Sequence, residues 1–283
     1  MTGQMPAKQF ITKSAQELVL AFLEFINEMN DNSIVLNLES IDLHFGGLQV
    51  LKKIDIAVGA NEVVGLIGPN GAGKTSLFNT ISGIVKPNSG KFILNGAERS
   101  FPKTHELAKL GIARTLQGVG LFGDLTVIEN IMISAAAHSK SQLLSAFLGR
   151  NHHQEEELRS KSLQALERVY AANLASRRAD TLTYPDAKRV ALARALVLNP
   201  KLLLLDEPAG GLGANDIRWM NELILQLKSQ MSILIVEHHM DVVMTVCDRV
   251  YVLNFGEIIA SGDSESVRKN PAVISAYLGT SAA

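Results

Sequence analysis

The sequence has little of what would place a protein outside the cytoplasm or inside a membrane. Cys247 is the only cysteine among 283 residues, so an internal disulfide is excluded and a reducing compartment is favoured. The longest apolar stretch, residues 18–26, contains Glu24 and falls short of the roughly 18–20 residues that a membrane span needs. A small-residue cleavage site of a secretory signal does not follow it. We therefore expect a chain that is soluble by itself.

An excess of charge of either sign is also absent. The formal net charge is −1 at pH 7, so nothing in the bulk charge favours a nucleic-acid partner. Hydrophobic residues make up 47% of the chain, which a well-filled core explains most simply, with a partner surface as the alternative. A chain of 283 residues is long enough for one large domain or for two smaller ones.

Residues 1–33 are predicted to form a helical extension. Ser14 and Glu17 have the spacing of a capping box, and an apolar run follows them. Apolar residues cover more than one face of this helix, so it should be buried. We expect it to pack on its own domain or on a sister subunit rather than on a membrane surface, because its cationic residues are few.

From residue 34 the pattern predicts a parallel α/β core. Residues 34–45 and the segment "LKKIDIAV" alternate apolar and polar side chains like half-buried strands. In contrast, "EVVGLIG", "KLLLLDEP" and "SILIVEHH" are short apolar runs suited to strands that are covered on both faces. Residues 134–182 have few strand formers and predict helices. "DRVYVLNFGEIIASG" predicts a terminal hairpin with Gly256 near its turn.

The segment "GPNGAGKT" matches G-x-x-x-x-G-K-[ST] between a predicted strand and a predicted helix. Its glycines let backbone N–H groups converge on phosphate oxygens, and the helix directs its positive end at the anion. The lysine can reach the terminal phosphates, and the threonine hydroxyl can bind Mg²⁺. A glycine-rich turn without chemistry is the alternative, which the flanking strand and helix disfavour. The predicted nucleotide-binding residues here are Gly68, Pro69, Asn70, Gly71, Ala72, Gly73, Lys74, Thr75 and Ser76.

Two carboxylates follow the apolar run "LLLLDEP". A magnesium nucleotide needs a carboxylate at a nearby strand end, and Asp206 can enter the shell of the metal while Glu207 orients or deprotonates a water molecule. An ordinary strand-end turn is the alternative, which the phosphate loop disfavours. The pair indicates hydrolysis rather than storage of the nucleotide.

These motifs, in this order and spacing, resemble the ATP-binding cassette (ABC) family over about residues 34–279. The resemblance implies a P-loop NTPase fold in residues 34–280, with a parallel-sheet RecA-like core, an antiparallel β subdomain and an α-helical insertion at about 118–190.

The same resemblance implies roles for further residues. Phe45 would stack on adenine and His238 would contact the γ-phosphate, whereas His239 receives no role. Gln117 would meet the metal or the attacking water, so that Thr75, Gln117 and Asp206 would surround Mg²⁺.

A closer resemblance, in "VEHHMDVV" and "NPAVISAYLG", is to the ATPase subunits of bacterial branched-chain amino-acid importers. It implies ATP hydrolysis coupled to uptake of a small solute, by a peripheral subunit on the cytoplasmic face of the plasma membrane. The implied partners are a second ABC ATPase, transmembrane permease subunits and, indirectly, a solute-binding protein. A soluble cassette protein without a permease and a degenerate regulatory cassette are the alternatives.

One loop departs from the family pattern. Where relatives read Leu-Ser, a variable residue, Gly and Gln, this chain reads "LTYPD". Thr183 keeps a hydroxyl, but Pro185 lacks an N–H that would point at the γ-phosphate of the opposite cassette, and Asp186 adds a carboxylate there. Gly213 stands where the family usually has Asp or Asn.

These departures predict an asymmetric pair of ATPases, in which this chain forms a heterodimer with a second ABC ATPase subunit. The chain's own set of Lys74, Asp206, Glu207 and His238 should work, whereas the site completed by its variant loop should be weak or inactive. A tolerated variant with full activity is the alternative.

Overall fold

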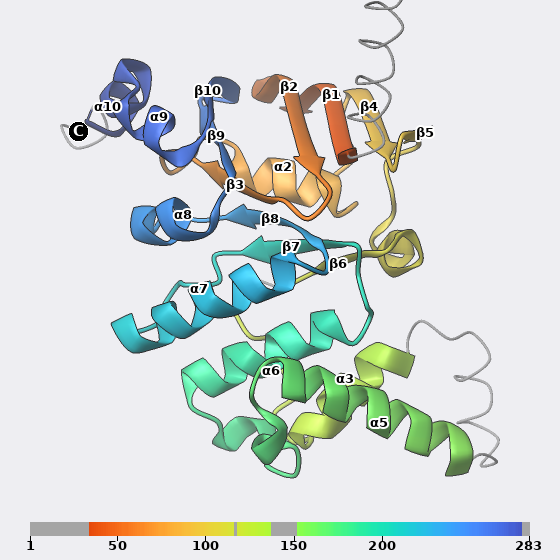
Figure 1. Ribbon diagram of the computed structural model, residues 1–283. Helices are drawn as coiled ribbons and strands as arrows, with labels where there is room; N and C mark the ends of the chain where they lie inside the picture. Colours follow the sequence, from red (N-terminus) through yellow and green to blue (C-terminus); the bar gives the residue numbers. More distant parts are fainter. Residues whose placement is uncertain (1–33, 116–117, 137–151, 279–283) are drawn as a thin grey trace, which may run out of the picture.

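Two β-sheets organise the part of the chain that the computed structural model describes, residues 34–115, 118–136 and 152–278 (Figure 1). The predicted helical extension at residues 1–33 and the predicted site residue Gln117 lie outside this part. The two sheets share one hydrophobic core, and helices cover the far side of the larger sheet.

The larger sheet has six strands in the order β10-β9-β3-β8-β7-β6. All neighbouring pairs are parallel except β10 with β9. The strands are β3 (Val63–Ile67), β6 (Ile112–Arg114), β7 (Leu202–Asp206), β8 (Ser232–Val236), β9 (Arg249–Asn254) and β10 (Glu257–Gly262).

The apolar runs of the central strands arise because both faces of this sheet are buried. In β7, Leu202 and Leu204 point into the core shared with the smaller sheet, whereas Leu203 and Leu205 point into the core under the helices. Every residue of β3, β7 and β8 is buried. Successive side chains of a strand point to opposite faces, so a strand that is buried on both faces needs apolar residues at consecutive positions.

The smaller sheet is antiparallel, in the order β2-β1-β4-β5. It contains β1 (Ile34–Phe45), β2 (Leu48–Gly59), β4 (Ser89–Leu94) and β5 (Ala97–Arg99), and its inner face packs on α2 (Lys74–Ile81) and on the larger sheet. The sequence predicted β1 and β2 but missed β4, β5 and β6. The strands β5 and β6 have three residues each, and in β4 only Phe92 and Leu94 are buried, so little periodicity marks them.

Helices lie in the segments that connect the strands of the larger sheet. They are α3 (Val127–Ala136), α5 (His152–Arg168), α6 (Tyr184–Leu196), α7 (Ala214–Lys228) and α8 (Met240–Val246), with short 3₁₀ turns η1 (Thr104–Leu110), η2 (Ala172–Leu174) and η3 (Ala179–Thr181). In Figure 1, α3, α5 and α6 lie together at the end of the molecule opposite the smaller sheet. No helix in these described ranges has the length and apolar character needed to cross a membrane.

Two boundaries differ from the sequence prediction. The helical region begins at Val127 rather than at residue 134, because Thr126 and Glu129 form a capping box there, the backbone N–H of each donating to the other's side-chain oxygen. The hairpin of β9 and β10 is confirmed but is not terminal, since α9 (Ser264–Lys269) and α10 (Pro271–Leu278) follow it. The bounds 118–190 for the helical insertion stay a prediction, and α6 runs past residue 190.

Candidate functional site

A glycine-rich loop joins β3 to α2. Gly68 has φ +151°, and a Cβ built on it would lie 2.0 Å from the carbonyl oxygen of Leu253, so no other residue fits there. Gly73, with φ +109°, directly precedes α2. The loop therefore holds its backbone close to its neighbours and leads straight into a helix N-terminus, which is the geometry that favours anions.

Lys74 is the first residue of α2 and its side chain turns back over the loop. Its Nζ donates hydrogen bonds to the carbonyl oxygens of Gly68 at 2.6 Å and Pro69 at 2.9 Å, and the residue is 8% exposed. Burial lowers the pKa of Lys74, and the carboxylate of Glu207 opposes that effect. A buried ammonium held by neutral carbonyls favours an anionic partner such as a phosphate.

The strand register brings three loops to one edge of the larger sheet. Leu66 of β3 pairs with Val236 of β8, and Val236 pairs with Asp206 of β7. Because all three strands are parallel, the residues that follow them leave the sheet at the same level, outside its carboxyl ends. The phosphate loop, the Asp206–Glu207 pair and the turn at His238 therefore share one edge.

Asp206 is held by an arginine that sequence reasoning missed. The Arg114 Nη2 atom lies 2.7 Å from Asp206 Oδ2, with the two side chains 10% and 5% exposed. Arg114 ends β6, and its Nη1 atom also donates to Asn79 Oδ1 at 2.8 Å on α2. The backbone N–H of Asp206 donates to Thr115 Oγ1 at 3.3 Å. Thr115 immediately precedes the segment that holds Gln117, which lies outside the described residues.

Glu207 stands in a left-handed backbone conformation, with φ +47°. Its carbonyl oxygen accepts a hydrogen bond from Lys188 Nζ at 3.1 Å and another from the Gly210 N–H at 3.1 Å. Its carboxylate Oε1 lies 3.7 Å from His238 Nδ1. A non-glycine residue in this conformation costs on the order of 1–3 kcal/mol, and active sites are one place where folded proteins retain such strain. Lys188 was not predicted, because a lysine in an amphipathic helix gives no local signal.

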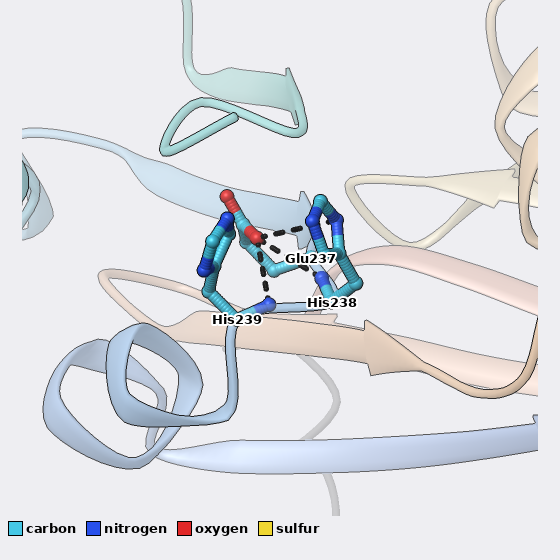
Figure 2. A group of neighbouring side chains, drawn as sticks. All are labelled: Glu237, His238 and His239. Atoms are coloured by element: carbon cyan, nitrogen blue, oxygen red, sulfur yellow. Dashed lines mark hydrogen bonds and ion pairs between the residues drawn. The ribbon is translucent and has the colours of Figure 1, made fainter. Parts of the chain in front are cut away.

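The turn after β8 is built around a second missed residue, Glu237 (Figure 2). This carboxylate is fully buried, and it accepts hydrogen bonds from the backbone N–H groups of Ala209 at 2.8 Å, His238 at 2.9 Å and His239 at 3.1 Å. It thereby ties the turn that carries His238 to the loop that follows Glu207. An acid directly before a histidine at the end of an apolar run was the available sequence signal.

The predicted site residues differ in how the structure places them. Glu207 lies near both Lys74 and His238: its charge raises the pKa of Lys74 against the effect of burial, and its Oε1 atom is 3.7 Å from His238 Nδ1. Phe45 is 51% exposed at the end of β1, where a base could stack on its ring. Thr75, in the first turn of α2, is exposed. Pro69 and Ala72 are buried, Asn70 and Gly71 are exposed, and Gly73 and Ser76 are half-buried. The role of each of these residues stays a prediction.

The variant loop begins helix α6 and is internally satisfied. Thr183 is the N-cap: its Oγ1 accepts the Asp186 N–H at 3.3 Å and donates its proton to Asp186 Oδ2 at 2.9 Å. Pro185 lies in the first turn, where its missing N–H costs the helix nothing. The Tyr184 hydroxyl donates to the carbonyl oxygen of Gly210 at 3.2 Å. The Thr183 hydroxyl, expected to be available to a phosphate, is instead engaged by this chain's own carboxylate.

Comparison with known families gives one match that covers more than half of the chain. The family described as "ABC transporter" matches residues 51–210. The chain belongs to this family. A second family, "Branched-chain amino acid ATP-binding cassette transporter", matches residues 257–283. Membership in the ABC transporter family implies the binding and hydrolysis of ATP.

Curated relatives and solved structures agree with this assignment. The high-affinity branched-chain amino acid transport ATP-binding protein LivG of Escherichia coli K12 is 37% identical over 249 residues, which is 87% of this chain and 98% of that protein. BraF of Pseudomonas aeruginosa, which carries the same description, is 35% identical over 249 residues, with the same coverage. A crystal structure of the ADP conformation of an ATP-binding cassette of an ABC transporter has a TM-score of 0.78 and 33% identity, and covers 87% of this chain and 99% of that chain. The predicted α/β P-loop fold of the ABC type is thus confirmed.

The Arg114–Asp206 pair yields a prediction about stability. Replacing one partner of a buried ion pair leaves a charge without compensation, so Arg114→Gln should lower the free energy of unfolding by about 3–5 kcal/mol. Adding Asp206→Asn removes the orphaned charge and should recover part of the loss. Urea denaturation followed by circular dichroism measures both effects.

The matched control is Arg178→Gln. Arg178 pairs with Asp124 and Asp180 on the surface, where its side chain is 52% exposed, and exposed pairs contribute little. This variant should shift the urea midpoint far less. Equal shifts for the two arginine variants would contradict the importance assigned to the buried pair.

Proposed function

We propose that this chain is the ATP-hydrolysing subunit of an ABC importer that takes up branched-chain amino acids. The observation that carries the proposal is the shared edge of the larger sheet, where three parallel strands end at one level. The segments that follow these strands carry Lys74, Glu207 and His238, and Asp206 is the last residue of β7. The solute class rests on the relatives named above, because a subunit of this kind contains no feature of its own that recognises the solute.

The phosphate loop binds the nucleotide in this proposal, and two oxygen donors near it bind the accompanying Mg²⁺. Backbone N–H groups of residues 68–73 and the ammonium of Lys74 hold the phosphates, and Phe45 stacks on adenine. A carboxylate and a hydroxyl suit Mg²⁺, and Asp206 and Thr75 supply them at this edge, with Gln117 as the expected third donor. Mg²⁺, when bound, neutralises charge on the β- and γ-phosphates. Arg114 fixes the orientation of the Asp206 carboxylate.

Glu207 and His238 carry the hydrolytic step. Glu207 accepts a proton from a water molecule while the water oxygen forms a bond to the γ-phosphorus, and the bond from that phosphorus to the β–γ bridging oxygen breaks, leaving ADP and phosphate. His238, 3.7 Å from Glu207 Oε1, contacts the γ-phosphate and orients it. Lys188 and Glu237 act through the backbone and hold Glu207 and His238 in place.

The partners follow from the same assignment. A second ABC ATPase completes the nucleotide site from its own signature loop, and transmembrane permease subunits receive the conformational change. A solute-binding protein takes part indirectly, by delivering the solute to the permease. The subunit then works as a peripheral protein on the cytoplasmic face of the plasma membrane. The names of the relatives, which describe transport ATP-binding proteins, support this arrangement.

Glu207→Gln tests the hydrolytic role. The variant keeps the shape of the side chain but loses the base, so we expect kcat for ATP to fall at least about hundredfold with binding of ATP retained. Phosphate release by the assembled complex and nucleotide binding by the purified subunit measure the two quantities. Glu222→Gln, on the exposed face of α7, is the matched control and should leave both unchanged. Unchanged turnover in Glu207→Gln would remove Glu207 from the mechanism.

Uptake of labelled leucine tests the transport role of the same variants. Cells lacking this gene should regain uptake with the wild-type chain or with Glu222→Gln and should not regain it with Glu207→Gln. The wild-type chain should also purify with membranes only when its permease is present. A stable complex without any permease would instead support the soluble cassette protein.

The variant loop favours an asymmetric pair of ATPases. In the proposed dimer this loop closes over the ATP that the partner holds. Pro185 cannot donate the hydrogen bond that a glycine would, a loss of about 1.5–3 kcal/mol. The Thr183 hydroxyl already donates to the Asp186 carboxylate, which also adds a negative charge to this loop. The site that this chain completes for its partner should therefore be the weaker one, in a heterodimer.

Pro185→Gly combined with Asp186→Gln tests this asymmetry. The pair restores an N–H donor, removes a negative charge and frees the Thr183 hydroxyl, so nucleotide affinity or turnover of the assembled complex should rise. Asp216→Asn, which removes an acid from the first turn of α7, serves as the control and should change neither quantity. Without any gain in the double variant, the loop is a tolerated variant and the asymmetry is wrong.

A further inference from the structure

Two adjacent histidines and two carboxylates gather at the turn after β8. His238 Nδ1 lies 4.0 Å from Glu237 Oε2 and 3.7 Å from Glu207 Oε1, and the ring centroids of His238 and His239 are 4.3 Å apart. Figure 2 shows the Glu237 carboxylate beside the two imidazole rings. His239 has no role in the proposed hydrolysis, and it adds a second imidazole to the cluster.

The donor atoms are close enough to converge on one ion. One donor atom from each of Glu237, His238 and His239 falls within 4.8 Å of the other two. Tetrahedral zinc, with bonds of about 2.0–2.2 Å, places neighbouring donors about 3.3 Å apart. His238 is exposed and His239 half-buried, so rotation of the two rings about their side-chain bonds can close the difference. Glu237 supplies the fixed point, because three backbone N–H groups hold its carboxylate.

Glu237 also retains the capacity to bind a cation. A carboxylate has about four lone-pair positions, and the three N–H donors from Ala209, His238 and His239 use three of them. The carboxylate is fully buried, so its charge is poorly solvated, and a cation at the exposed rim would compensate it. Glu207 Oε1, 3.7 Å from His238 Nδ1, adds a further carboxylate oxygen to the cluster.

We propose that Glu237, His238 and His239 bind one zinc ion, with Glu207 within reach as an additional ligand, and that this ion inhibits the ATPase. Two imidazoles and a carboxylate are a ligand set for a borderline transition metal and not for Mg²⁺, which prefers oxygen donors alone. The site is thus distinct from the expected magnesium site of Thr75 and Asp206.

The inhibitory half of the proposal rests on the proposed function, and the binding half does not. A zinc-bound imidazole has its nitrogen lone pair engaged by the metal and its ring held toward Glu237, so His238 no longer reaches the γ-phosphate. If Glu207 also binds the ion, its carboxylate is withdrawn from the attacking water. Both effects lower turnover without occupying the phosphate loop.

Zinc binding is measured on the nucleotide-free full chain without a histidine tag. Competition with a chromophoric zinc chelator gives stoichiometry and Kd, and cobalt in place of zinc gives the visible absorption of a site with nitrogen and oxygen ligands. We expect one ion per chain and a Kd at least about tenfold weaker in His239→Gln, because one of three ligands is lost. His105→Gln, at an exposed histidine on η1, is the matched control and should bind as the wild type does. Equal affinity in wild type and His239→Gln would overturn the site.

Inhibition is measured in the assembled complex at fixed Mg·ATP, with free zinc set by a metal buffer. His239→Gln should keep the basal rate and require at least about tenfold more zinc for half inhibition, whereas His105→Gln should behave as the wild type. Zinc binding that depends on His239 but leaves turnover unchanged would overturn the inhibitory half alone. A complex without any basal ATPase activity would contradict the proposed function and leave the binding result as the test of the site.

Discussion

The parallel register of β3, β8 and β7 is the constraint on which the site depends. Leu66, Val236 and Asp206 lie at one level across three strands, so the loops that follow them cannot leave the sheet anywhere except at the same edge. The strands keep that register because each buries one row of side chains against the smaller sheet and another against the helices. A slip of one residue would exchange the two rows. Packing on both faces therefore positions the chemistry.

Around this edge, buried charges are held by fixed partners. Lys74 lies against backbone carbonyls, Asp206 against Arg114, and Glu237 against three N–H groups. Such groups are already oriented before a ligand arrives, and preorganised dipoles are what stabilise developing charge most effectively. The left-handed conformation of Glu207 fits the same pattern, because Lys188 and Gly210 hold its carbonyl oxygen while the carboxylate faces His238.

Much of the fold and part of the site can be predicted from the sequence. The phosphate loop and the buried apolar strands β3, β7 and β8 have local signals, and so has the hairpin of β9 and β10. Arg114 and Lys188 have none, because each acts on a residue at least 19 positions away that only the folded chain brings near. Glu237 has only its place before a histidine at the end of an apolar run, and its hydrogen bond to the Ala209 N–H exists only in the folded chain. The strands β4, β5 and β6 were missed because their few buried residues give no periodicity. The hydrogen bond from the Thr183 hydroxyl to the Asp186 carboxylate could not be predicted either, since the spacing alone suggests only a helix cap.

The account depends most directly on Mg·ATP binding at the phosphate loop of the purified chain. Calorimetric titration of the wild type and of Lys74→Ala with ATP, with and without magnesium, measures it. We expect measurable affinity for the wild type, strengthened by magnesium, and at least a tenfold loss in Lys74→Ala, because the variant lacks the ammonium that now rests on the loop carbonyls. A folded wild-type chain with no affinity for adenine nucleotides in the presence of magnesium would contradict the account.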